Sequence, residues 1–92
     1  MAEQLFPMGR IVATPGALEA LAEAGKEPAE LLDRHGAGFW GDLGEEDWKA
    51  NEEALRRGWR LLSSYNIEGG VKVWIITEAD RSATTILRPE EY

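Results

Sequence analysis

The chain has 92 residues, 17 acidic against 10 basic side chains, a formal net charge of -7 and no cysteine. A chain of this length forms one small domain, expected here over residues 1–92. The composition excludes disulfides, thiol nucleophiles and Cys-ligated metal centres, and it argues against direct nucleic-acid binding, which needs clustered Lys and Arg.

The beginning of the chain predicts neither export nor membrane insertion. Residues 1–10 lack the basic start and apolar stretch of a secretory signal. No apolar run approaches the roughly 20 residues that span a bilayer. We therefore expect a cytoplasmic protein without a membrane partner, in which residues 1–8 and 89–92 are loosely ordered.

A short strand and two helices are expected first. The β-branched run over residues 9–14 predicts a strand. Thr14 then suits the N-cap of a helix and Pro15 its first position, because the missing N–H of proline costs nothing there. This helix ends at Gly25, and its apolar stripe comprises Leu18, Leu21 and Ala22. A second helix is expected over residues 28–36, and one of its faces carries Leu31, Leu32 and His35.

The clearest helical pattern covers residues 45–57. Acidic residues occupy the first turn and arginines the last, as the helix dipole favours. Either Asp42 or Gly44 is expected to precede the helix, and Gly58 ends it. Three pairs place an acid four positions before a base: Glu45–Lys49, Glu52–Arg56 and Glu53–Arg57. Helix stability alone therefore accounts for the densest cluster of charge.

The rest of the chain predicts an antiparallel meander. Strands are expected over residues 61–66, 71–77 and 82–87, with a glycine-bearing turn after the first and a polar turn after the second. The fold class is therefore α+β in the order β-α-α-α-β-β-β: a three-stranded antiparallel meander plus the N-terminal strand, with helices packed on one face. The returning strand, Ser82 to Leu87, is a candidate sheet edge to which a partner strand or a second copy of the chain would add.

A candidate interaction surface combines one tryptophan with the polar turn. Trp40 lies in the glycine-rich loop of residues 36–41 and is expected to be the most exposed of the four tryptophans. The other three are expected in the core: Trp48, Trp59 and Trp74. The candidate surface comprises Trp40, Asp80, Arg81, Ser82 and Thr84. The competing interpretation is a solvated turn, in which Asp80 bonds nearby backbone.

Weaker candidates for a pocket are His35, Asp42 and Asn51. His35 is the only histidine, so imidazole catalysis must use it; the alternative is a histidine that interacts with the C-terminal dipole of its helix. Asn51 either bonds a strand or loop backbone or lines a pocket beside Trp48. No serine lies in a nucleophile-elbow motif, and no zinc or calcium pattern is matched by His35, Asp42, Glu45 and Glu46. No catalytic residue, metal ligand or cofactor is assigned.

Three segments stand out together: GRIVATPGALEAL (residues 9–21), WGDLGEEDWKANEEALRRG (residues 40–58) and VWIITEADRSATTILRPEEY (residues 73–92). They resemble a family of short bacterial proteins found around plasmids and integrated mobile elements. Members are called plasmid-related proteins, or carry a label naming a type I restriction enzyme modification subunit. The resemblance implies an association with mobile DNA and no particular activity. A DNA methyltransferase needs a nucleotide-type α/β domain and a base-flipping pocket, for which this chain has no room.

Three functions are compatible with these patterns. The leading hypothesis is an accessory protein of plasmids or mobile elements that acts through contacts with another protein and performs no catalysis. The second is an acidic DNA mimic that inhibits a restriction or defence system; it requires carboxylates spaced like phosphates among Glu45, Glu46, Glu52, Glu53, Glu78 and Asp80. The third is a small metal-dependent hydrolase that uses His35 with Asp42 or Glu45.

Overall fold

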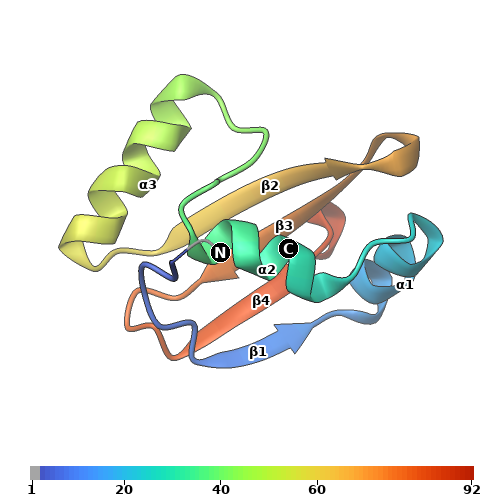
Figure 1. Ribbon diagram of the computed structural model, residues 1–92, viewed down its shortest axis with the longest axis horizontal. Coiled ribbons are helices and arrows are strands. Elements are labelled where there is room, and N and C mark those ends of the chain that lie inside the picture. The colour runs from blue at the N-terminus through green and yellow to red at the C-terminus, as the bar shows by residue number, and fades with distance from the viewer. Residues whose placement is uncertain (1–2) are drawn as a thin grey trace.

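Three α-helices and a four-stranded sheet make up the computed structural model, which describes residues 3–92. The order of elements is β1 (Arg10–Ala13), α1 (Pro15–Glu23), α2 (Pro28–Gly36), α3 (Glu45–Arg57), β2 (Leu61–Ile67), β3 (Val71–Thr77) and β4 (Ala83–Leu87). Short 3₁₀ turns follow β2 and β4, at Glu68–Gly70 and Pro89–Glu91. The predicted α+β class and its order of elements are confirmed (Figure 1).

The strands lie in the order β1-β4-β3-β2. β2, β3 and β4 form the predicted antiparallel meander, whereas β1 pairs in parallel with β4. The Arg10 N–H donates to the Ser82 carbonyl and the Thr14 N–H to the Ile86 carbonyl, both at 3.0 Å. The expectation that Ser82–Leu87 forms a sheet edge is therefore wrong, because β1 covers β4 on that side. A parallel neighbour arrives through a long crossover, which hairpin patterns between adjacent strands do not reveal.

Local sequence determines where the helices begin and end. Thr14 Oγ1 accepts the N–H of Ala17 at 3.1 Å, and Pro15 opens α1 as predicted. α3 begins after Gly44 rather than Asp42. It ends at Gly58, whose φ of 76° is the left-handed conformation that favours glycine. These caps satisfy backbone groups that the helices leave unpaired.

Two of the three predicted ion pairs on α3 are present: Glu45–Lys49 at 3.3 Å and Glu53–Arg57 at 2.5 Å. Arg56 also pairs with Glu53. Glu52 instead accepts a hydrogen bond from Trp40, so the predicted Glu52–Arg56 pair does not form. The helix is stabilised much as expected, but one acid reaches into the tertiary structure.

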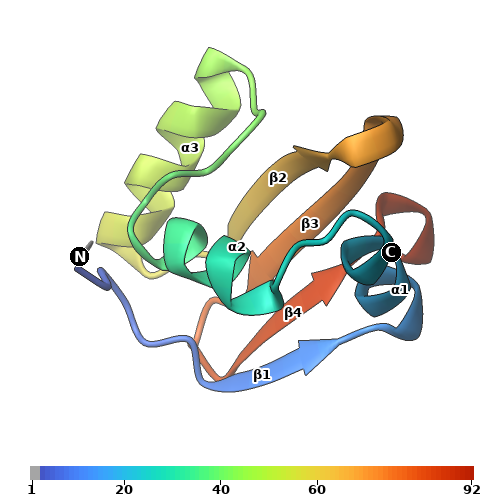
Figure 2. The ribbon, with the colours of Figure 1, turned by 45° about the vertical axis from the view of Figure 1, so that its right-hand side comes forward.

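The helices cover one face of the sheet, as predicted. α2 crosses in front of the strands, α1 packs at one end, and α3 runs beside β2 (Figure 2). Alternate residues of the strands point to this side, and the core comprises Tyr65, Ile67, Val73, Ile75 and Ile86 against Ala17, Ala20, Leu21 and Leu31. A smaller adjoining cluster contains Phe6, Trp40, Ala54 and Leu61. Leu18, predicted for the apolar stripe of α1, is 46% exposed instead.

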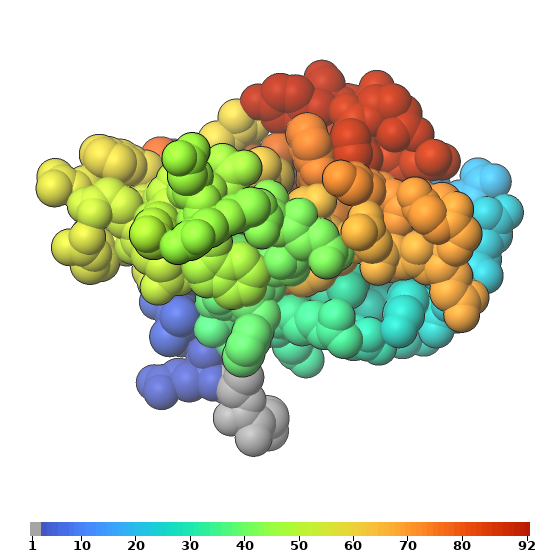
Figure 3. All heavy atoms as spheres, turned by 90° about the horizontal axis from the view of Figure 1, so that it is seen from above, coloured from blue at the N-terminus to red at the C-terminus, as the bar shows by residue number. Residues whose placement is uncertain are grey.

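The C-terminal residues lie on the other face of the sheet, opposite α2 (Figure 3). The rings of Tyr92 and Trp74 meet edge to face with centroids 6.0 Å apart. Arg60 donates to the Tyr92 hydroxyl at 2.6 Å, and the Thr14 hydroxyl donates to Glu91 at 2.6 Å. Residues 89–92, predicted to be loosely ordered, thus make defined contacts.

The segment before β1 is tied to the core through Phe6, which is buried. The prediction of loose order for residues 1 and 2 lies outside the described residues. Within residues 3–92, no helix has both the length and the apolarity to cross a membrane.

Candidate functional site

A chain of polar side chains runs through the interior on the helix-covered face. His35, near the end of α2, is fully buried. Its Nδ1 lies 2.6 Å from Ser63 Oγ, and its Nε2 lies 2.8 Å from Thr77 Oγ1. Thr77 Oγ1 lies 2.8 Å from Thr84 Oγ1, and the Thr84 hydroxyl donates to the Met8 carbonyl at 2.8 Å. This series of hydrogen bonds therefore connects α2, three strands and the N-terminal segment.

The protonation state of His35 follows from the last acceptor in this series of hydrogen bonds, the Met8 carbonyl. The Met8 carbonyl only accepts, so the Thr84 hydroxyl donates to it and accepts from Thr77. Thr77 must then accept from the Nε2–H of His35, which leaves Nδ1 to accept from Ser63. A neutral imidazole satisfies every bond. Burial, reinforced by the positive charge of Arg81, lowers the pKa of His35 from 6.5 to about 4.

The surroundings of His35 prevent it from binding a metal or acting as an acid or base. The rings of Phe6 and Trp40 pack edge-on against the imidazole, with centroid separations of 5.3 and 5.6 Å. Both ring nitrogens are engaged, so neither is free to bind a metal or to exchange a proton with a substrate. A neutral ring also does not make the interaction predicted with the helix dipole. Across residues 3–92, the His, Asp and Glu side chains form no group of three that could hold a metal ion.

The side chain of Asn51, on α3, lies against the outer edge of β2. Its Nδ2 donates to the Leu62 carbonyl at 2.5 Å, and its Oδ1 accepts the Leu62 N–H at 3.1 Å. One buried amide thus replaces the strand that would otherwise pair with β2 there. The prediction that Asn51 bonds a strand backbone is confirmed.

Replacing Asn51 with alanine should therefore lower the free energy of unfolding by about 1–3 kcal/mol, because the N–H and carbonyl of half-buried Leu62 lose their partners. Urea unfolding followed by circular dichroism measures the change. Lys49→Ala, on the exposed side of the same helix, is the matched control and should change stability by no more than about 0.5 kcal/mol. Equal effects of the two substitutions would contradict the role given to Asn51.

Residues 40–42 cover the next part of the β2 edge. The Trp40 carbonyl accepts the Ser64 N–H at 3.0 Å, and the Asp42 N–H donates to the Ser64 carbonyl at 2.5 Å. The Asp42 carboxylate then accepts the Asn66 N–H at 2.8 Å. Gly41, with a φ of 82°, lies so close to the Ser64 carbonyl that a Cβ would collide with it. Asp42 therefore protects a sheet edge and does not cap α3.

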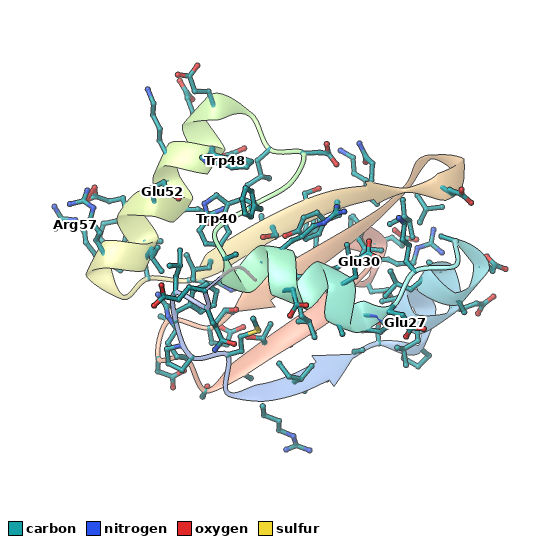
Figure 4. All side chains as sticks on the ribbon, viewed as in Figure 1. Glu27, Glu30, Trp40, Trp48, Glu52 and Arg57 are labelled. Atoms are coloured by element: carbon teal, nitrogen blue, oxygen red, sulfur yellow. The ribbon has the colours of Figure 1, made fainter. Side chains whose placement is uncertain are left out.

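The prediction that Trp40 is the exposed tryptophan is wrong. Its side chain is fully buried between α3 and the sheet, and its Nε1–H donates to Glu52 at 2.7 Å (Figure 4). The exposed aromatics in this region are instead Phe39, at 59%, and Trp59, at 53%. Trp59 follows Gly58, where the chain leaves the helix, so it departs from the stripe that predicted it in the core.

The polar turn between β3 and β4 holds the sheet to the end of α3. The Arg81 guanidinium donates to the carbonyls of Trp59 at 2.7 Å and Ala54 at 3.3 Å. Asp80 accepts the Ser82 N–H at 3.0 Å, which confirms the interpretation as a self-bonded turn. Of the five residues predicted to form one interaction surface, Trp40 and Thr84 are buried, Arg81 is half-buried, and only Asp80 and Ser82 are exposed.

A groove of about 510 Å³ opens between α2, residues 39–42 and β2, and we call it the α2–β2 groove. Its apolar and aromatic lining comprises Leu31, Phe39, Trp48, Tyr65 and Ile67. Its charged lining comprises Lys26, Glu30, Arg34 and Asp42. The three elements meet on the face shown in Figure 3, and Trp48 lies on the side of α3 that faces the groove (Figure 4). Asp42 thus borders the groove, whereas His35 and Asn51 do not.

The charges around the groove balance one another. Glu30 lies between Lys26 at 3.5 Å and Arg34 at 3.6 Å. The Tyr65 hydroxyl donates to the Phe39 carbonyl at 2.5 Å, and burial raises the pKa of Tyr65 to about 12, so the phenol stays neutral. The result is an aromatic groove with two cations and two carboxylates around it, and no excess of either sign.

No family model matches the chain, and no curated protein or solved structure matches it either. The choice of the α2–β2 groove as the candidate site therefore depends on its geometry alone. The glycine-rich loop of residues 36–41 predicts that both of its aromatics plug the core, and for Phe39 this is wrong, because its side chain is 59% exposed. The signal for this was its position beside Trp40, because adjacent residues in an extended segment point in opposite directions. When Trp40 turns inward, Phe39 turns outward.

Proposed function

We propose that the chain is a non-catalytic binding module whose α2–β2 groove receives a segment of a partner protein. The observation that carries this proposal is Phe39, which remains 59% exposed at a groove that already contains Trp48 and Tyr65. Apolar side chains left exposed beside a hollow are typical of interaction sites.

The lining of the groove favours a protein partner. Aromatic residues in a partly buried pocket are the usual anchors of protein interfaces, where a few side chains supply most of the affinity. Lys26 and Arg34 are both tied to Glu30, so they do not form the unbalanced cationic site that a phosphate group needs. We therefore expect the partner to insert an aliphatic or aromatic side chain and to carry charges of both signs on either side of it.

The setting of this interaction is inferred from the sequence. The resemblance to plasmid-associated proteins supports a partner encoded by a plasmid or an integrated mobile element. The absence of cysteine is consistent with a reducing compartment, so we place the interaction in the cytoplasm.

A DNA mimic is less well supported. It requires an unbroken array of carboxylates, but most of the candidate acids have partners: Glu45 with Lys49, Glu53 with Arg56 and Arg57, Glu78 with Arg60, Glu52 with Trp40 and Asp80 with the Ser82 N–H. Cations are thus interspersed among the acids of α3 (Figure 4). The hydrolase has no geometric support, because His35 is buried and fully bonded.

The proposal predicts a specific loss of binding in Phe39→Ala. Peptides selected from a random displayed library on the purified protein, then measured by fluorescence anisotropy, should bind this variant at least about tenfold more weakly, because it removes one anchor. Trp59→Ala removes an aromatic of similar exposure outside the groove and should bind as the parent does. The proposal fails if selection yields no binder, or if selected peptides bind the Phe39 variant unchanged.

A further inference from the structure

The outer edge of β1 is the side of the sheet that no element covers in the described chain. β1 forms the lower border of the sheet in Figure 1, with no strand or helix beyond it. The opposite border is protected, because Asn51 and residues 40–42 bond the outward groups of β2. Ile11 and Val12, by contrast, are 46% and 41% exposed. An uncovered apolar edge strand is a template for pairing with another strand.

The register of β1 determines which backbone groups are free. The Arg10 N–H donates to Ser82, just before β4, and the Thr14 N–H donates to Ile86 in β4; alternation gives Val12 the same direction. Ile11 and Ala13 therefore direct their N–H and carbonyl groups outward. This arrangement repeats every second residue around Val12, so the edge is complementary to itself under a two-fold rotation.

We propose that the occupant of this edge is a second copy of the chain, paired antiparallel through β1 about a two-fold axis at Val12. Ile11 of each copy then lies opposite Ala13 of the other, and these pairs exchange N–H···O bonds in both directions. Val12 faces Val12 of the second copy as the close, non-hydrogen-bonded pair on the axis. Two four-stranded sheets become one continuous sheet.

Charge complementarity favours a second copy over an unrelated strand. In this register Arg10 lies opposite Thr14 of the second copy, and the Thr14 hydroxyl holds the Glu91 carboxylate at 2.6 Å. Arg10 is exposed, and no carboxylate among residues 3–92 lies within ion-pair distance of it. The two-fold axis thus creates two Arg10–Glu91 pairs, and no like charges meet along the strand. The edge and the α2–β2 groove lie on different elements, so either proposal stands if the other fails.

Cysteine cross-linking tests the register directly, because the chain has no cysteine of its own. In this non-hydrogen-bonded pair the two Val12→Cys residues would lie about 4.5 Å apart at Cα, within the range of a disulfide. Ile11→Cys is the matched control at similar exposure: its two copies lie diagonally, about 7–8 Å apart, beyond the usual limit. Under mild oxidation we expect disulfide-linked dimer to form at least about tenfold faster for Val12→Cys.

Sedimentation of the cysteine-free protein supplies the second arm. Val12→Lys places two cations on the axis and should weaken the dimer at least about tenfold, whereas the isosteric Val12→Thr should leave it nearly unchanged. The proposal is overturned if the parent is a monomer at about 100 µM, well above micromolar dissociation constants. It is equally overturned if the two cysteine variants cross-link at the same rate, or if the dimer survives Val12→Lys.

Discussion

Trp40→Ala should lower the free energy of unfolding by about 3–5 kcal/mol, the range for loss of a large buried aromatic. Trp40 is fully buried, stacks 6.3 Å from the ring of Phe6 and meets His35 edge-on. A small domain has only about 5–15 kcal/mol of stability in total, so this variant approaches the limit of folding. Urea unfolding monitored by far-UV circular dichroism measures the loss without relying on tryptophan fluorescence.

Two further variants separate the contributions of Trp40. Trp40→Phe keeps an aromatic ring in the core but removes part of the indole and the Nε1–H bond to the exposed acid Glu52, so it should cost less than the alanine variant. Trp59→Ala removes an exposed ring and should change stability by no more than about 0.5 kcal/mol. A Trp40→Ala variant as stable as Trp59→Ala would show that Trp40 does not organise this side of the core.

The unfolding free energy should fall as pH drops from 6.5 towards 4, because of His35. Its pKa is lowered to about 4 in the folded protein by burial and by Arg81, whereas the unfolded chain protonates near 6.5. Between these values the unfolded state binds more protons, so stability is complete above pH 6.5 and is lost as pH falls. Each pH unit in this range lowers the free energy of unfolding by about 1.4 kcal/mol, so about 2 kcal/mol is lost at pH 5.

Two carboxylates with lowered pKa values affect stability only at a lower pH than His35 does. The Ser82 bonds lower the pKa of Asp80, and the Thr14 bond lowers that of Glu91, so both carboxylates lose their contribution only below their ordinary values of 3.8 and 4.5. His35→Gln should therefore be less stable than the parent at pH 7 yet show little slope between pH 6.5 and 5. Urea unfolding at several pH values gives both slopes. A flat parent curve in that window would contradict the buried neutral histidine.

The order of elements was predictable because each signal is local. Thr14 and Pro15 begin α1, Gly58 ends α3, and the strands alternate about their turns. The parallel pairing of β1 with β4 was not predictable, because residues about 70 positions apart meet there without any repeating pattern in the sequence between them.

Among the polar residues and Trp40, too, local signals were predictable and long-range contacts were not. Asn51 was predictable as a buried amide on the core face of its helix, and its partner is the backbone of a strand. His35 was misjudged because its partners, Ser63 and Thr77, lie on two strands that only the tertiary structure brings together. Trp40 was misjudged because a glycine-rich loop indicates exposure, whereas here the loop serves as an extra strand along β2.

The polar candidates His35, Asn51 and Asp42 maintain the fold, and we propose that the α2–β2 groove binds a protein. Nuclear magnetic resonance tests it directly, since the four tryptophans supply four indole N–H signals. Titration with a selected peptide should shift the Trp48 indole and the amides of residues 26–34, 39–42 and 65–67, and leave the Trp59 and Trp74 indoles in place. Shifts confined to the Trp59 or Trp74 regions, or none at saturating peptide, would contradict binding in the α2–β2 groove.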